Sequence, residues 1–198
     1  MSSDNLIFYH CPVKEATKVD HRNPTQWAQM GQIYLKMGQK NKAKEALMRT
    51  MAYKEDPQEP IVVFVRLAQL LAEEGDWLES RRHFLLACER CPTSTAWLGV
   101  GIASLRLGEL QEVKISSPKY KINISYFQAE DALAEANLLD SKNATVWAYL
   151  SLLCLKTNRK QEAEQSFKFA LKLNLENPDL LSEIRLLQQQ VGFGDPSY

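Results

Sequence analysis

The chain has 198 residues, of which 45% are apolar and 24% are charged, and its 24 basic and 24 acidic side chains give a formal net charge of zero. This composition is typical of a globular protein, and without a basic excess it argues against a surface for nucleic acid or anionic membranes. Because no apolar run reaches about 18 residues and the first residues lack the regions of a signal peptide, we expect a cytoplasmic protein with no membrane span. The dispersed cysteines favour a reducing compartment over a disulfide framework.

The first residues, 1–23, do not contain a complete repeat of the kind found later in the chain. Ala16 and residues 20–24 resemble the end of a helix and the loop that follows it, whereas residues 1–12 give no convincing helix. We interpret 1–23 as a partial repeat. The hypothesis that follows is that the chain is the carboxyl-terminal part of a longer repeat protein, or a short variant of one.

A phrase that begins with an aromatic residue and ends with a turn residue recurs along the chain. Its apolar and small residues between these ends match the first helix of the tetratricopeptide repeat, which has a period of about 34 residues. Glycine at the end of the phrase can take the left-handed conformation that ends a helix. The phrases run from Trp27 to Gly38, from Phe64 to Gly75, from Trp97 to Gly108 and from Trp147 to Asn158.

A second pattern follows each phrase, in which small, large and small side chains alternate at helical spacing. Small residues let two helices approach, and large ones fill the gap to the next hairpin. Asp76 and Glu79 form the pattern of a capping box at the start of one such helix. The small–large–small sets are Ala43, Leu47 and Thr50, then Ser80, Phe84 and Ala87, and then Ala163, Phe167 and Ala170.

These patterns predict an all-α fold, a tetratricopeptide-type α-solenoid of antiparallel helix hairpins with a carboxyl-terminal capping helix. A generic antiparallel helix bundle is the alternative, but it predicts no fixed period. The array spans 24–190 and is followed by a Gly/Pro-broken tail at 191–198. We place the repeats near 24–57, 61–93, 94–143 and 144–177, and the capping helix at 178–190.

The third repeat is interrupted by an insertion at 113–128, which has β-branched residues, a proline and no helical period. Its removal restores the small residues that begin at Ala129 to their expected places. Because its ends, Val-Lys and Phe-Gln, can be encoded by splice-site sequences, a retained intron is one interpretation. A functional loop with a phosphorylation site at Ser117 and Pro118 is the other. In either case we expect only a short second helix, 129–139.

Cys88 and Cys91 form a C-x-x-C pair. A structural zinc site needs two such pairs or added histidines, and a reactive pair favours the amino end of a helix. This pair falls at the expected carboxyl end of a helix, so we interpret both cysteines as structural. With no nucleophile–base, phosphate-binding or metal pattern elsewhere, we predict a protein that is not an enzyme and has no catalytic, cofactor-binding or metal-binding residues.

In stacked hairpins of this kind the first helices line a concave groove. The side chains expected to face it are polar in the first two repeats and mainly apolar in the last two, which favours an amphipathic helix or an apolar peptide as the ligand. The alternative is that the apolar members pack between adjacent hairpins. The predicted protein-binding residues are Gln32, Arg66, Gln69, Leu98, Ile102, Arg106, Tyr149, Leu152 and Lys156.

Four phrases of the last repeats and the tail are distinctive, and they lie at 96–103, 107–110, 129–137 and 191–197. These phrases resemble the cilia- and flagella-associated protein 70 family of tetratricopeptide proteins. The resemblance covers roughly 13–198, although 113–128 departs from the family pattern. It implies a component of the ciliary axoneme that supports dynein arms or motility.

We therefore expect a non-enzymatic scaffold of the cilium or flagellum axoneme, with axonemal or ciliary proteins as partners. A general cytosolic adaptor or co-chaperone is the alternative. Co-chaperones of this fold hold a peptide carboxylate with lysine, asparagine and arginine at set groove positions. The corresponding residues here are Ala28, Gln32, Val65, Thr95 and Gly99, which disfavours such a clamp.

Overall fold

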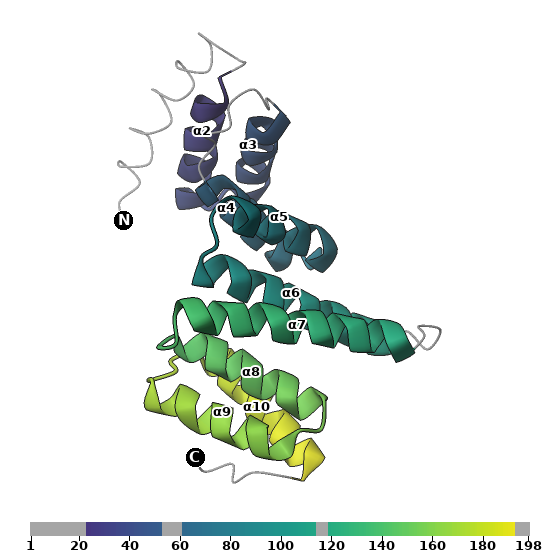
Figure 1. Ribbon diagram of the computed structural model, residues 1–198. Coiled ribbons are helices and arrows are strands. Elements are labelled where there is room, and N and C mark those ends of the chain that lie inside the picture. The colour runs from purple at the N-terminus through teal and green to yellow at the C-terminus, as the bar shows by residue number, and fades with distance from the viewer. Residues whose placement is uncertain (1–22, 53–60, 114–118, 193–198) are drawn as a thin grey trace.

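The computed structural model describes residues 23–52, 61–113 and 119–192, and within these ranges all regular secondary structure is α-helical (Figure 1). The predictions for the amino-terminal segment up to residue 22, for Ser117 and Pro118, and for the tail from residue 193 lie outside the described residues. The helices are α2 (Pro24–Lys36), α3 (Lys40–Ala52), α4 (Ile61–Glu73), α5 (Trp77–Arg90), α6 (Ser94–Val113), α7 (Lys119–Leu139), α8 (Ala144–Lys156), α9 (Lys160–Lys172) and α10 (Pro178–Val191).

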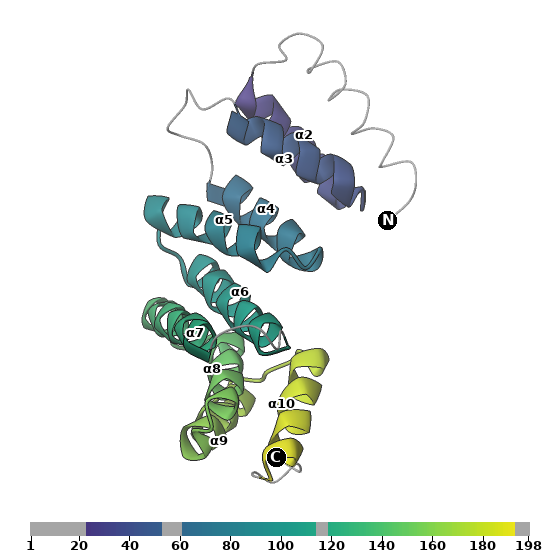
Figure 2. The same cartoon turned by 90° about the vertical axis from the view of Figure 1, so that its right-hand side faces the viewer.

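Consecutive helices pair into hairpins that stack along one axis, as Figures 1 and 2 show. The pairs are α2–α3, α4–α5, α6–α7 and α8–α9. Within each pair the two helices pack extensively against each other. The first helix of each later hairpin also packs on the second helix of the hairpin before it. This arrangement confirms the predicted all-α stack of helix hairpins. No helix in the described ranges is both long and apolar enough to cross a bilayer.

The close approach of the two helices in a hairpin depends on small residues, as the sequence pattern predicts. Gly31 of α2 lies against Leu47 of α3, and a Cβ atom at Gly31 would stand 2.7 Å from the Leu47 Cδ2 atom. Gly101 and Leu133 repeat the same arrangement between α6 and α7. Both leucines are fully buried. Each leucine side chain occupies the space that a side chain at the facing glycine would need.

Two of the turns use glycine for its backbone freedom. Gly38 and Gly75 have φ angles of 72° and 82°, and Asn158 takes the same left-handed conformation with φ 61°. The side chain of Asp76 then accepts a hydrogen bond of 3.2 Å from the backbone N–H of Glu79 and caps α5. The predicted capping box is only half formed: the Asp76 N–H donates to the Leu71 carbonyl oxygen at 2.9 Å, and the Glu79 carboxylate pairs with Arg82.

Gly108 does not end its helix, and the prediction that it does is wrong. The helix α6 continues through this position to Val113. The reason is the packing of Tyr126 from α7, whose ring occupies the place of a side chain at Gly108. A Cβ atom there would stand 2.5 Å from the Tyr126 Cε1 atom.

The third hairpin is longer than the others, and its long arm extends beyond them in Figure 1. The helix α7 has 21 residues and begins at Lys119, so the expectation of a short second helix at 129–139 is wrong. All described residues of the segment 113–128, namely 113 and 119–128, are helical. Ser125 and Tyr126 within it are 4% and 5% exposed. Tertiary burial therefore outweighs the weak helical pattern of this segment.

Candidate interaction groove

The nine predicted groove residues all lie on the first helices of their hairpins, but the structure divides them into two groups. Three belong to α2 and α4, where an open pocket lies between the helices. The other six belong to α6 and α8, where α10 packs on α8 and pairs with Arg106 of α6. The two groups therefore have different surroundings and are described separately.

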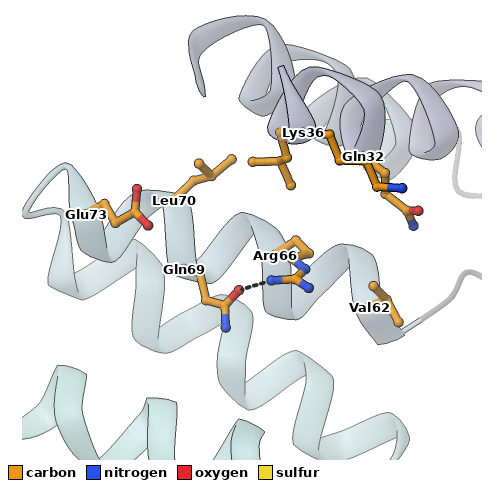
Figure 3. A pocket seen from close by; sticks show the side chains of 8 residues that line it. Gln32, Lys36, Val62, Arg66, Gln69, Leu70 and Glu73 are labelled. Carbon is orange, nitrogen blue, oxygen red and sulfur yellow. Dashed lines mark hydrogen bonds between the residues drawn. The ribbon is translucent and has the colours of Figure 1, made fainter. Parts of the chain in front are cut away.

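Between α2 and α4 lies a pocket of about 360 Å³, called here the α2–α4 pocket (Figure 3). The predicted residues Gln32, Arg66 and Gln69 all line it. Sequence reasoning missed its apolar members, because their position depends on the spacing between two hairpins rather than on helical periodicity. The complete lining is Gln32, Leu35, Lys36, Val62, Arg66, Gln69, Leu70 and Glu73.

The polar side chains of the α2–α4 pocket are arranged around an exposed guanidinium group. Arg66 Nη1 donates a hydrogen bond of 3.1 Å to Gln69 Oε1, which holds the guanidinium along α4 (Figure 3). At the far end of the pocket Glu73 pairs with Lys40 at 2.6 Å, so its charge is already compensated. Arg66 and Lys36 thus leave the pocket with a cationic side, which suits a carboxylate of a ligand.

The α2–α4 pocket also has an apolar side, which can bind an apolar side chain of a ligand. Val62 is 48% exposed, Leu35 is half-buried, and Leu70 forms part of the buried core behind them. A short peptide segment with one acidic and one apolar side chain would satisfy both kinds of surface.

On α6 and α8 the predicted groove is occupied by the chain itself. Leu98 and Tyr149 pack against the same apolar cluster as Leu180 and Ile184 of α10. The sequence predicted α10 only as an end cap, because its apolar stripe indicates burial but does not indicate which surface it covers. Leu98 and Tyr149 therefore pack into the same core as α10 and are only partly exposed.

The prediction that Leu152 lines the groove is wrong. Its side chain is 0% exposed and lies within the core cluster of the last two hairpins. A partner cannot contact it without opening that core. Ile102 is half-buried on α6, so it stays a candidate for partner contact.

Arg106 is the centre of a charged network at the edge of this cluster. Its Nη2 atom donates a hydrogen bond of 2.7 Å to Glu183 Oε2 on α10, and its Nη1 atom also bonds both Glu183 and Glu109. Lys156 lies 3.3 Å from the second oxygen of Glu109. The hydrogen bond to Glu183 is the largest influence on the Arg106 guanidinium, and it raises the pKa of that group. Glu183, which the sequence did not single out, thus completes the site from α10.

Tyr149 lies beside this network. Burial raises the pKa of its phenol, while the Arg106 guanidinium acts in the opposite direction. The phenol therefore stays protonated at neutral pH and can only donate or accept hydrogen bonds there.

The C-x-x-C pair lies where the sequence predicts, at the end of α5. Cys88 is buried, whereas Cys91, the C-cap residue of α5, is exposed. Burial raises the pKa of the Cys88 thiol to about 11, so the thiolate is scarce at neutral pH. In the ranges described, no three His, Cys, Asp or Glu side chains come close enough to hold a metal ion.

The sequence matches a family model described as the cilia and flagella-associated protein 70 C-terminal domain, over residues 9–116 and 123–190. The break in this match, 117–122, is narrower than the predicted insertion 113–128. The chain is 40% identical over 186 residues to human cilia- and flagella-associated protein 70, which covers 94% of the chain and 15% of that protein. The protein of the same name from Macaca fascicularis is 43% identical over 150 residues, covering 76% of the chain and 13% of the relative. The chain therefore spans only about a seventh of the length of these relatives.

Solved structures show the same fold at low sequence identity. A tetratricopeptide repeat protein from Parabacteroides merdae superposes with a TM-score of 0.73 and 14% identity, covering 96% of this chain and 68% of that one. The type IV pilus biogenesis factor PilW gives a TM-score of 0.70 and 17% identity, with coverage of 98% and 82%. A thermophilic repeat protein from Thermus thermophilus gives 0.67 and 19%, with coverage of 86% and 84%. These likenesses confirm the tetratricopeptide-type solenoid.

Proposed function

The chain belongs to the cilia- and flagella-associated protein 70 family, and we propose that it is a non-enzymatic scaffold of the motile cilium or flagellum axoneme that supports dynein-arm function. Repeat arrays of this fold typically act by binding other proteins, and each hairpin contacts only its neighbours. The stack can therefore present a continuous surface without a catalytic centre. Its localisation, in this proposal, is the axoneme.

The observation that carries the proposal is the open α2–α4 pocket. It combines an exposed cation at Arg66 with an apolar wall at Val62, and nothing in the described chain fills it. A peptide segment of a ciliary or axonemal protein can place a carboxylate against Arg66 and an apolar side chain against Val62. The pocket then sets the register of the partner along the stack.

Proximity labelling in ciliated cells tests this proposal with the tagged protein. Arg66→Glu reverses the charge of the pocket without touching the core, so we expect the labelling of axonemal proteins to fall several-fold. Arg82→Glu is the matched control, because Arg82 lies on the second helix of the same hairpin and pairs with Glu79. Circular dichroism confirms that both variants are folded.

Equal labelling by the Arg66→Glu and Arg82→Glu variants would remove the pocket from the proposal. Labelling dominated by cytosolic chaperones, in place of axonemal proteins, would support the alternative of a general adaptor or co-chaperone.

A further inference from the structure

The last helix, α10, does not occupy the position that the repeat pattern gives to a next helix. The first helices α4, α6 and α8 each pack on the second helix of the preceding hairpin, namely α3, α5 and α7. By that rule α10 would pack on α9, but its main contact is α8. In Figure 2 α10 lies beside the last hairpin, below the end of α6. It thus lies on the surface where the sequence predicts the groove.

From this position we propose that the surface of α6 and α8 is a receptor for an amphipathic helix with a carboxylate, and that α10 is its internal, displaceable ligand. The inference deepens the proposed scaffold function and rests on it. The occupant that replaces α10 is a helix of another protein, and α10 itself gives the pattern that such a helix needs.

The first element of that pattern is a charge pair. Arg106 holds both oxygens of Glu183, and its side chain is 23% exposed. A bidentate pair of this kind fixes the position and the direction of a carboxylate. A partner helix must therefore bring an acidic residue to the same place.

The second element is the apolar face that surrounds this carboxylate. Leu180 is 3% exposed and Ile184 is 0% exposed, and both belong to the core cluster of the last two hairpins. They stand one turn apart on α10, with Glu183 next to Ile184. A competing helix needs apolar residues at these two positions.

The third observation is a defect in the fit of α10. Gln188 is 3% exposed, and its Oε1 atom has no hydrogen-bond partner among the residues that the structure describes. A buried polar atom without a partner weakens the docking of the helix that carries it. A helix with an apolar residue at this position would avoid that loss and bind more tightly than α10, which makes displacement possible.

A labelled synthetic peptide of residues 177–191 tests the receptor by fluorescence anisotropy with the full chain. In the wild-type chain α10 competes from within the same molecule, so we expect weak binding. Glu183→Arg in the chain places a cation opposite Arg106 and weakens the internal helix only. The wild-type peptide should then bind about tenfold more tightly, a change that a lost charge-assisted bond supports.

Two further variants of the chain separate the charge pair from a general effect on the helix. Asp179→Arg makes the same charge change at an exposed position of α10, and we expect little gain in peptide binding. Arg106→Glu together with Glu183→Arg restores the internal pair in reverse. The matching peptide with Glu183→Arg should then bind this chain no more tightly than the wild-type peptide binds the wild-type chain. Circular dichroism and thermal unfolding show that each chain is folded.

A second peptide keeps the test decisive if the Glu183→Arg chain does not fold. The peptide with Gln188→Leu removes the buried amide, and it should bind the wild-type chain about tenfold more tightly than the unmodified peptide. Equal affinities of the two peptides, or no gain in a folded Glu183→Arg chain, would overturn the proposal. Dimers that exchange α10 between copies, seen by light scattering, would overturn the assignment to a separate partner. Because no ciliary protein is present, these outcomes are independent of the α2–α4 pocket.

Discussion

At the scale of single residues, the absence of a side chain at Gly108 decides how the third hairpin closes. The Tyr126 ring is 5% exposed and fills that space, and its surroundings leave it little room to move. Gly108→Ala should therefore lower the free energy of unfolding by about 1–3 kcal/mol, as overpacking does. Urea unfolding measures the change. Leu110→Ala is the control, since Leu110 is on the same helix and 46% exposed, and an equal loss there would contradict the argument.

The cysteines give a second residue-scale prediction, on the pH dependence of thiol reactivity. Burial raises the pKa of both Cys88 and Cys154 to about 11, so their thiolate fraction at pH 8 is about one in a thousand and grows as the pH rises. Exposed Cys91 should be alkylated first at pH 8, with Cys88 and Cys154 following only near pH 11 or on unfolding. Mass spectrometry of the alkylated peptides measures this order. Equal rates for the three thiols in the folded chain would contradict it.

At the scale of helices and turns, local sequence signals predicted most of the turns and helix caps that the structure shows. The left-handed turns at Gly38 and Gly75 and the cap at Asp76 follow from the residues at those positions alone. The long α7 could not be predicted in this way. Its first turns have β-branched residues in the sequence and no clear apolar stripe, and the burial of Tyr126 depends on the gap that Gly108 leaves on α6.

A proline substitution distinguishes a continuous α7 from an inserted loop. Ser125 is 4% exposed and lies inside α7, so Ser125→Pro removes a helical hydrogen bond and should cost about 3 kcal/mol or more. Hydrogen exchange should show the loss of protection spreading through α7. Ser141→Pro, in the turn after α7, is the control with an expected smaller effect. Tolerance of proline at Ser125 would mean that the segment is a loop.

At the scale of the whole molecule, the order of stacking follows from the repeat pattern but the place of α10 does not. Periodicity along one helix predicts which face is buried, and Ile184 is buried as expected. It does not predict which surface covers that face, because Arg106 and Glu183 are 77 residues apart in the sequence and are brought together only by tertiary packing. For the same reason the sequence did not predict that the groove has two parts. The part on α2 and α4 is an open pocket, and on the other part α10 packs on α8 and pairs with Arg106.

The separation of the stack into neighbouring units predicts how it loses structure. Leu152 is fully buried in the cluster that joins the last two hairpins to α10, so Leu152→Ala should cost about 2–5 kcal/mol. Because a repeat array propagates stability only between neighbours, α8, α9 and α10 should lose hydrogen-exchange protection before α2 and α3 do. Leu186→Ala is the control, since Leu186 is on α10 but 56% exposed and should change stability by no more than about 0.5 kcal/mol. Uniform loss of protection along the whole chain in Leu152→Ala would mean that the hairpins unfold as one cooperative unit.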